Sequence, residues 1–362
     1  MNLTEILKTA VDTNASDVHL VVGLPPILRV DGEIVTTPYD VLTDDETDRL
    51  ILENLTAAQR DKLVETRQLC YSLKLPDVGY FRVTIYHSKA QLGASIRVGS
   101  TSIRPLEELG LPSIVGDLAR RPAGLVLITG PTGSGKTTTL NAMIDQINRE
   151  RRCKIITVED PIEYLHSNKR SVIVQQEVGT DARTFDEAIV HILRQDPNVI
   201  GVGEMRDLNT ITTALTAAET GHLVLSTLHT PNASETVNRI VDVFPAGQQN
   251  QVRQQLSSTL LGIVAQQLLP RIDRAGRIVA TEVLVTNEAV RNIIREGKIQ
   301  MLPNTIRTGR AEGMLSVDDC LRELYQTGVI TYDTAANRVS HPDLLRGESD
   351  RFDPTATDQS RL

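Results

Sequence analysis

Residues 125–147 read LVLITGPTGSGKTTTLNAMIDQI, and this stretch decides how the rest of the chain is interpreted. An apolar run precedes a loop with three glycines, and apolar side chains at helical spacing follow it. Such a loop between a strand and a helix is typical of phosphate binding, because its backbone N–H groups and the helix N-terminus face one anion. A glycine-rich turn with an incidental lysine is the alternative, and the flanking strand and helix argue against it. We therefore expect a nucleotide to be bound by Gly130, Pro131, Thr132, Gly133, Ser134, Gly135, Lys136, Thr137 and Thr138.

Around this stretch, short apolar runs alternate with helical patterns, which is typical of an α/β domain with a mostly parallel sheet. The expected strands are Leu125 to Thr129, Lys154 to Val158, Val199 to Val202 and Leu223 to Ser226. The expected helices include Phe185 to Leu193 and Leu208 to Ala218. From about Pro270 we expect smaller helices, one of which is capped by Ser316 and ends near Gly328. This domain is expected over residues 113–345.

The first hundred residues have a different pattern, in which short apolar runs alternate with turn signals. One helix, Thr43 to Gln59, is expected to interrupt the strands, and Phe81 to Val98 is expected to form a hairpin. We therefore predict a smaller α+β domain over residues 1–102 and a linker over 103–112. The polar, aperiodic residues 346–362 are expected to form a disordered tail.

Composition excludes several classes of protein. The chain has 362 residues, 38 Lys and Arg against 46 Asp and Glu, a net charge of −8 and only 3% aromatic residues, which disfavours nucleic-acid binding. Its three cysteines lie far apart and form no zinc or disulfide pattern, so a cytosolic location is expected. Neither a signal peptide nor a spanning helix is expected, so the chain should not insert into a membrane.

Polar side chains follow three of the expected strands, and in a parallel sheet these carboxyl ends share one edge. Gly203 precedes Glu204 where an aspartate usually serves the Mg²⁺ ion, so other acids should lie near the metal. Glu159, Asp160 and Glu163 are the candidates for that role, Thr137 can itself ligate the metal, and Glu204 is left to orient or deprotonate the attacking water. His229 can bond a γ-phosphate oxygen, although a buried histidine bonded to a carbonyl is an alternative. The remaining candidates at these strands are His222 and Arg206.

Two arginines of the expected hairpin suggest a second part of the site. If the hairpin closes symmetrically around Lys89 and Ala90, Arg82 lies directly opposite Arg97, and two like charges so placed repel. An anion between them would remove the repulsion, so we expect this face to meet the nucleotide of a neighbouring subunit. The alternative is that the register differs or that both arginines pair with local acids.

From Ser16 to Leu345 the sequence resembles the secretion-type hexameric ATPases and, among them, the type IV pilus retraction ATPases. The motifs that carry the resemblance are Ala-Ser-Asp-Val-His-Leu at 15–20, the phosphate loop, Glu-Asp-Pro-Ile-Glu at 159–163, Val-Gly-Glu-Met-Arg-Asp at 202–207, and Thr-Gly-His with Ser-Thr-Leu-His-Thr at 220–230. The resemblance implies a PAS-like first domain, a RecA-like second domain, a homohexamer and Mg²⁺-dependent ATP hydrolysis. It also implies that Glu204 prepares water, that Glu163 serves the metal, that His229 contacts the γ-phosphate, and that Arg82 and Arg97 act across the subunit boundary.

Two features favour pilus retraction over pilus assembly. We expect the chain to lack the extra N-terminal domain and the tetracysteine insert of assembly and type II secretion members. Residues 289–296, Ala-Val-Arg-Asn-Ile-Ile-Arg-Glu, are close to a signature of retraction members and include Arg291, Asn292 and Arg295; an ordinary capped helix with solvated arginines is the alternative. We therefore expect a motor attached peripherally to the cytoplasmic face, acting on an inner-membrane platform protein of the pilus. The alternatives are an accessory retraction ATPase, an assembly or secretion ATPase, a nucleotide-gated switch that does not hydrolyse, and a DNA-translocating motor.

Overall fold

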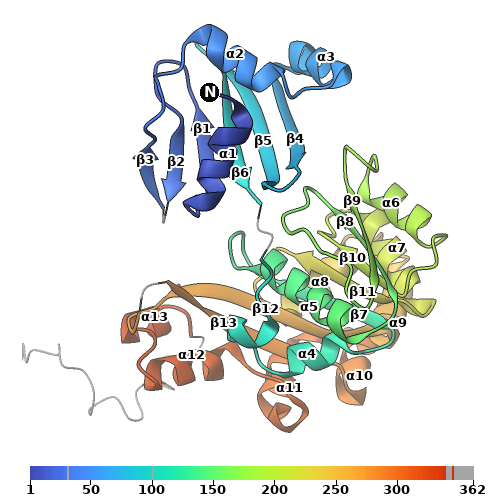
Figure 1. The fold of residues 1–362 in the computed structure, drawn as a ribbon. Helices are drawn as coiled ribbons and strands as arrows, with labels where there is room; N and C mark the ends of the chain where they lie inside the picture. Colours follow the sequence, from blue (N-terminus) through green and yellow to red (C-terminus); the bar gives the residue numbers. More distant parts are fainter. Residues whose placement is uncertain (31, 100–101, 275, 340–344, 346–362) are drawn as a thin grey trace, which may run out of the picture. The chain divides into compact units, whose positions relative to one another are not determined.

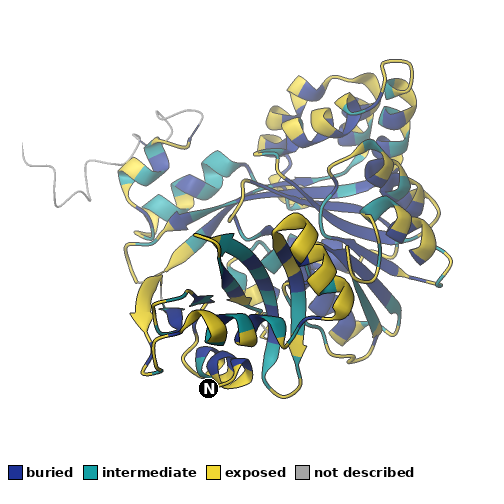
Figure 2. Ribbon diagram, turned by 90° about the horizontal axis from the view of Figure 1, so that it is seen from above, coloured by how far each residue is buried: buried dark blue, intermediate teal, exposed yellow. Residues whose placement is uncertain are grey.

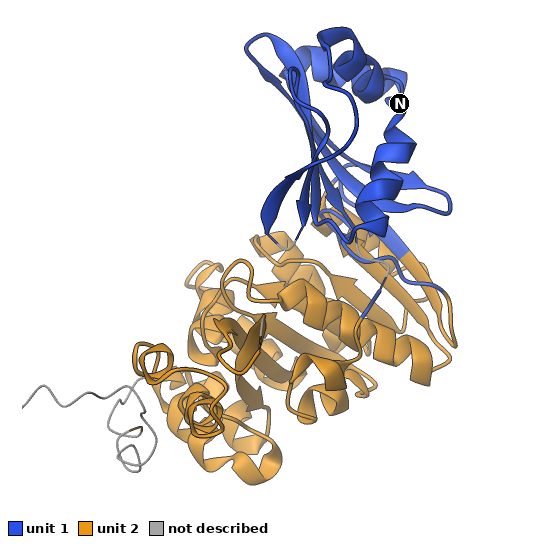
Figure 3. Ribbon diagram, turned by 60° about the vertical axis from the view of Figure 1, so that its left-hand side comes forward, with its two compact units in different colours: residues 1–103, 159–167, 175–183 blue, residues 104–158, 168–174, 184–362 orange. Residues whose placement is uncertain are grey.

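The computed structural model describes residues 1–30, 32–99, 102–274, 276–339 and 345. Its contacts divide the chain into two compact units, which Figure 3 shows in two colours. Unit 1 comprises residues 1–103, 159–167 and 175–183, and unit 2 comprises residues 104–158, 168–174 and 184–362. The segment that contains the motif at 159–163 thus belongs by its contacts to the unit of the first hundred residues. The tail expected over 346–362 lies outside the described residues.

Unit 1 contains a six-stranded sheet in the order β3-β2-β1-β6-β5-β4, whose neighbouring strands are antiparallel. The helix α1 (Leu3–Asp12) buries Ile6, Leu7 and Ala10, and these pack with Phe81 and Ile85 in one apolar core. Figure 1 shows α1 lying across the strands of this sheet. The strands are β1 (Asp17–Leu20), β2 (Ile27–Val30), β3 (Glu33–Thr36), β4 (Gln68–Leu75), β5 (Gly79–Ser88) and β6 (Gln91–Val98).

The single helix expected over Thr43 to Gln59 is wrong, because two helices occupy this region. They are α2 (Asp44–Leu52) and α3 (Ala57–Thr66). Thr43 and Thr56 each accept a hydrogen bond from the backbone three residues on, and the Glu46 and Gln59 side chains bond back to the cap N–H groups. Since each capping box begins a new helix, the helical conformation is interrupted between Leu52 and Thr56.

The sheet of unit 2 has the order β13-β12-β7-β11-β10-β8-β9. The pairs β12·β7, β7·β11, β11·β10 and β10·β8 are parallel, which confirms the predicted parallel sheet. Figure 2 shows these strands as buried between helices of mixed exposure, as their apolar sequences require. The strands are β7 (Gly124–Thr129), β8 (Lys154–Glu159), β9 (Val172–Glu177), β10 (Val199–Val202), β11 (Leu223–Leu228), β12 (Leu260–Pro270) and β13 (Arg277–Val285).

The expectation that only smaller helices follow Pro270 is wrong in one respect, because β13 pairs antiparallel with β12 before those helices begin. The cap at Ser316 is confirmed, since its hydroxyl accepts from the Asp319 N–H at 3.1 Å. None of the helices within the described part of the chain is both long and apolar enough to cross a membrane. The helices of unit 2 are η1 (Leu106–Leu109), α4 (Ile114–Ala119), α5 (Lys136–Glu150), α6 (Phe185–Ile192), α7 (Leu208–Glu219), α8 (Ala233–Asp242), α9 (Gln249–Thr259), α10 (Glu288–Glu296), η2 (Ile299–Met301), α11 (Leu302–Thr308), η3 (Arg310–Glu312), α12 (Val317–Gln326) and α13 (Tyr332–Ala336).

Candidate nucleotide site

The phosphate loop connects the end of β7 at Thr129 to the start of α5 at Lys136. Gly130 has a φ of +139°, and a Cβ atom there would lie 2.1 Å from the backbone oxygen of Gln266 on β12. No side chain fits at that distance, so the close approach of β12 requires glycine. The Gln266 side-chain amide also donates to the carbonyl of Ser134 at 2.8 Å. One residue of β12 therefore contacts the loop at both of its ends.

The interior of this loop suits a bound polyanion. Lys136 is buried, and its ammonium donates to the carbonyls of Gly130 at 2.9 Å and Pro131 at 3.0 Å, beside the N-terminus of α5. The Ser134 hydroxyl is buried and has no hydrogen-bond partner among the described residues. A positive charge, a helix N-terminus and an unsatisfied hydroxyl together fit the phosphates of a nucleotide.

A second group of predicted residues lies at the carboxyl ends of β10 and β11. His229 directly follows β11, and its Nε2 is 3.0 Å from a carboxylate oxygen of Glu204. Its Nδ1 is 3.4 Å from the Lys136 ammonium. Arg206 pairs with the other Glu204 oxygen at 2.7 Å. The structure thus joins Lys136, His229, Glu204 and Arg206 in one chain of contacts.

The alternative of a buried histidine bonded to a carbonyl is wrong for His229, because its side chain is 43% exposed and its partner is a carboxylate. Burial by itself would raise the pKa of Glu204. The hydrogen bonds and charges of Arg206 and His229 outweigh burial and lower that pKa below its ordinary value. The contacts with Arg206 and His229 therefore favour the ionised form of Glu204.

His222 does not join this group, contrary to the expected convergence. It precedes β11, and its carbonyl accepts from Gly124 N at 3.0 Å, where β7 begins. In a parallel sheet this is the edge opposite the phosphate loop, which follows the end of β7. The His222 ring bonds locally, to the Ala217 carbonyl at 3.0 Å and the Thr220 hydroxyl at 3.2 Å.

The helix α10 carries the predicted residues Arg291, Asn292 and Arg295. Val290, Ile293 and Ile294 form its buried stripe, as expected. Arg291 is not a solvated arginine, because its guanidinium donates to the carbonyls of Ser257 at 2.6 Å and Ser258 at 2.9 Å, in the last turn of α9. Arg291 therefore caps a neighbouring helix.

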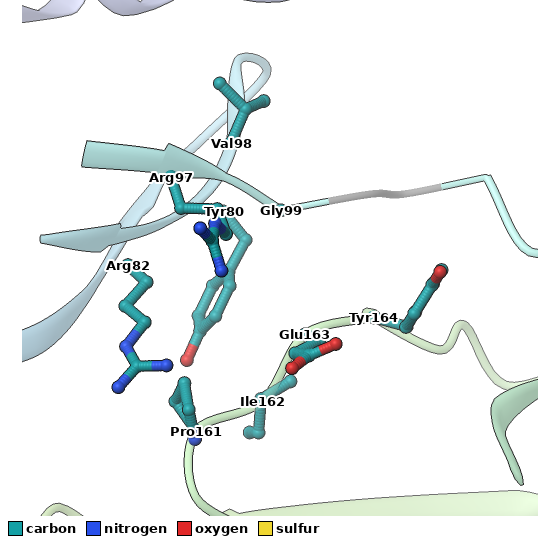
Figure 4. A pocket seen from close by; sticks show the side chains of 9 residues that line it. All are labelled: Tyr80, Arg82, Arg97, Val98, Gly99, Pro161, Ile162, Glu163 and Tyr164. Atoms are coloured by element: carbon teal, nitrogen blue, oxygen red, sulfur yellow. The ribbon is translucent and has the colours of Figure 1, made fainter. Parts of the chain in front are cut away.

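Within unit 1, the β5–β6 hairpin has the predicted register, with Arg82 directly opposite Arg97. Figure 4 shows both side chains reaching from the strands towards the acidic loop, residues 160–164. Together they line a cavity of about 150 Å³ with Tyr80, Glu163 and neighbouring residues. The register alternative is therefore wrong, and Glu163 shares a cavity with both arginines.

The alternative of local acid partners is correct for Arg97, whose guanidinium lies 3.1 Å from an Asp17 oxygen. Arg82 instead donates to the Cys70 sulfur at 3.4 Å. Its pKa is raised by that hydrogen bond and, more weakly, by the charges of Asp160 and Glu163, although burial opposes this. Asp17 thus reduces the repulsion between the two arginines without an added anion.

The acidic residues offer limited metal-binding capacity by themselves. Glu159 is buried and accepts from the Gln175 amide at 3.0 Å. Among the described residues, no three His, Cys, Asp or Glu side chains are grouped as a metal site. The side chains of Thr137, Glu159, Asp160 and Glu163 offer oxygen donors, which are the ligands that Mg²⁺ takes, usually one or two at a time, with phosphates and water completing its shell.

Two residues outside the predicted motifs, Gln266 and Glu177, help to shape these regions. Gln266 contacts the phosphate loop and is buried. Its only signal in the sequence is that it is a polar residue within the largely apolar segment Leu260 to Leu269. Glu177 ends β9 and is buried. No local pattern marks Glu177, because two of the side chains that bond to it, Ser72 and Tyr80, lie about a hundred residues earlier in the chain.

Comparison with known proteins supports the assignment of this region as a nucleotide site. Residues 111–338 match the model of the family described as type II/IV secretion system protein. The type IV pilus retraction ATPase PilT of Pseudomonas aeruginosa is 41% identical over 95% of this chain and 99% of that protein. A twitching motility protein of Neisseria gonorrhoeae is 40% identical over 95% of this chain and 92% of its own length. A crystal structure of the pilus retraction motor PilT with bound ADP superimposes with a TM-score of 0.89, at 42% identity, over 96% of this chain and 99% of that one.

Proposed function

The chain belongs to the type II/IV secretion system protein family and, within it, to the PilT pilus retraction ATPases, and from this premise we propose that it hydrolyses ATP to power the retraction of a type IV pilus. The observation that carries the proposal is the continuous set of contacts from the phosphate loop through Lys136 and His229 to Glu204. It connects a phosphate-binding cation, a residue able to contact the terminal phosphate and a carboxylate able to orient water. These are the groups that phosphoryl transfer to water requires.

In this mechanism the phosphate loop binds the triphosphate, and Lys136 exchanges its carbonyl partners for phosphate oxygens. Glu204 accepts a hydrogen bond from the attacking water, so that the water oxygen faces the γ-phosphorus. His229 bonds both Glu204 and the terminal phosphate, so loss of that phosphate changes the partners of both residues. Loss of the terminal phosphate would thereby change the contacts of the loop that follows β11.

Mg²⁺ is proposed as the metal of the reaction. Thr137, at the start of α5, would hold it together with Glu159, Asp160 or Glu163, directly or through water. When bound, Mg²⁺ supplies positive charge that neutralises the phosphates and polarises the bond that breaks.

We further propose that Arg82 and Arg97 bring positive charge to the nucleotide of a neighbouring subunit in a homohexamer. Burial of charge at such a boundary would couple hydrolysis to movement between subunits. The motor would act in the cytoplasm, at the inner face of the membrane, on a platform protein at the pilus base. No nucleic-acid partner is proposed, because the net charge of −8 disfavours one.

The biochemical test is phosphate release by the purified chain with Mg·ATP. We expect Lys136→Ala to lose nucleotide binding, and Glu204→Gln to bind ATP but to hydrolyse it at least about 100-fold more slowly. Tight binding without turnover by the unmodified chain would instead identify a nucleotide-gated switch. Stimulation of turnover by DNA would identify a translocating motor.

The cellular test is direct imaging of pili in cells that lack this chain. We expect pili to extend but not to shorten, and the unmodified gene, but not a Lys136→Ala copy, to restore shortening. Loss of extension would favour an assembly ATPase. Shortening at a normal rate but with reduced force would favour an accessory retraction ATPase.

A further inference from the structure

The carboxylate of Glu177 is the centre of a dense set of hydrogen bonds in unit 1. One of its oxygens accepts from the Ser72 hydroxyl at 2.5 Å, the Tyr80 hydroxyl at 2.6 Å and the backbone N–H of Ile162 at 3.1 Å. The other accepts from the Thr180 hydroxyl at 3.3 Å. The residue is only 4% exposed. Hydrogen bonds to a carboxylate are stronger than neutral ones, so this set fixes the groups that make it.

Three of these donors come from two places, the strands around Arg82 and the acidic loop. Ser72 on β4 lies directly opposite Arg82 in the sheet, and Tyr80 precedes Arg82 by two residues on β5. The third donor, Ile162, is the neighbour of Glu163 in the acidic loop. Figure 4 shows the Tyr80 ring reaching from the sheet towards Pro161 and Ile162. Glu177 thus fastens the acidic loop to the part of the sheet that carries Arg82.

The hydroxyl of Tyr80 acts as a donor throughout the neutral range. Burial raises its pKa, and the hydrogen bond to Glu177 raises it further, so the phenol stays protonated. Because the phenol is protonated and points at a carboxylate, the contact has one direction and one geometry. A rigid link of this kind is what a residue needs in order to place a neighbouring catalytic group.

We propose that Glu177 is a positioning residue of the hydrolysis site, which holds the acidic loop so that Glu163 faces Arg82 and Arg97. The inference rests on the proposed function, since the loop matters for turnover only if Glu163 serves ATP hydrolysis. It assigns Glu177 no contact with nucleotide. Loss of the link should therefore slow the chemical step and leave nucleotide binding intact, because the phosphate loop itself is unchanged.

The test compares Tyr80→Phe, Glu177→Gln and the double variant in the full chain. Tyr86→Phe is the matched control. Tyr86 lies on the same strand as Tyr80, and the substitution removes a tyrosine hydroxyl that does not bond to Glu177. We expect Tyr80→Phe and Glu177→Gln each to lower kcat about 10-fold, with KM for Mg·ATP and the Kd of a fluorescent ADP analogue within about twofold of the unmodified values. The double variant should be no slower than Glu177→Gln, since both changes break one link. Tyr86→Phe should match the unmodified chain.

Unchanged kcat in both single variants would overturn the proposal, as would effects of the two changes that multiply in the double variant. A loss of ADP binding in proportion to kcat would also overturn it, because that pattern indicates a role in folding alone. If Glu177→Gln does not fold, Ser72→Ala and Tyr80→Phe each remove one donor and carry the same expectation. Failure of the proposed function is recognised separately, by an unmodified chain that releases no phosphate or by a Lys136→Ala variant that still does.

Discussion

The side-chain amide of Gln266 on β12 donates to the backbone carbonyl of Ser134 in the phosphate loop, over 2.8 Å. The same residue's backbone oxygen occupies the space beside Gly130 where any side chain would begin. The two residues are 132 positions apart in sequence, and they meet because β12 runs parallel to β7 at the edge where the loop begins. The loop that binds phosphate is therefore shaped in part by a strand that contributes no residue to its motif.

Replacing Gln266 by Met should weaken nucleotide binding about tenfold, since the variant keeps the volume but removes the donor to Ser134. The Kd of a fluorescent ADP analogue measures this, with kcat at saturating ATP as a second readout. Gln267→Met is the control, because successive strand residues point to opposite faces of the sheet. Equal affinities for the two variants would show that the amide has no role in the loop.

Gly130→Ala should destabilise the fold far more than Gly133→Ala. At Gly130 the added Cβ would meet backbone, whereas at Gly133 nothing lies within 4 Å and only the φ of +77° is unfavourable. We expect a loss of about 1 kcal/mol in the free energy of unfolding at Gly133 and at least about 3 kcal/mol at Gly130. Urea unfolding compares them, and similar losses would mean that β12 can move away without cost.

Arg206→Ala should shift the acid limb of the pH profile of kcat/KM to higher pH. Arg206 helps to lower the pKa of Glu204, so its removal lets the carboxylate protonate earlier as pH falls. The contact between Arg206 and Glu204 stabilises the folded chain at pH values above the ordinary glutamate pKa of 4.5. This contribution is lost as pH falls through the lowered pKa of Glu204 in the folded chain. Glu204→Gln should show no such limb, and an identical limb in Arg206→Ala and the unmodified chain would contradict the assignment.

Mixing two inactive variants tests whether the hairpin arginines act between subunits. In a ring assembled from Lys136→Ala and Arg82→Ala chains, some sites would combine an intact phosphate loop from one chain with an intact arginine from its neighbour. We expect the mixture to recover measurable ATP hydrolysis that neither variant shows alone. Continued inactivity, with mixed assembly verified by two affinity tags, would place the arginine and the loop of one site in the same chain.

Arg291→Ala should destabilise the protein by about 1–2 kcal/mol, because two carbonyls at the end of α9 lose a charged donor. Arg295→Ala provides the comparison on the same helix, at an exposed position, and should change stability by less than about 0.5 kcal/mol. Thermal unfolding measures both. Equal effects would mean that the contacts of Arg291 with Ser257 and Ser258 contribute little.

Several features of the site follow from the sequence because they depend on neighbours in the chain. The spacing of Gly130 to Thr137 between an apolar run and a helical pattern predicts the phosphate loop. Placement of Glu204 and His229 at the ends of parallel strands predicts that they meet, and they do, 3.0 Å apart. The symmetric count around Lys89 and Ala90 predicts the register of Arg82 and Arg97, since a two-residue turn fixes hairpin pairing.

Other features depend on partners that are distant in sequence, and only the tertiary structure decides them. Local periodicity cannot reveal that Asp17 pairs with Arg97, that Arg291 caps another helix, or that Glu177 binds Tyr80. The sequence around His222 likewise suggests a site residue, but the tertiary structure places His222 at the edge of the sheet opposite the phosphate loop. The chain's own sequence thus determined the chemistry of the loop and the class of fold, because these rest on local spacing. The tertiary structure alone decided which charges are paired and which remain available to a substrate, because pairing depends on where distant segments meet.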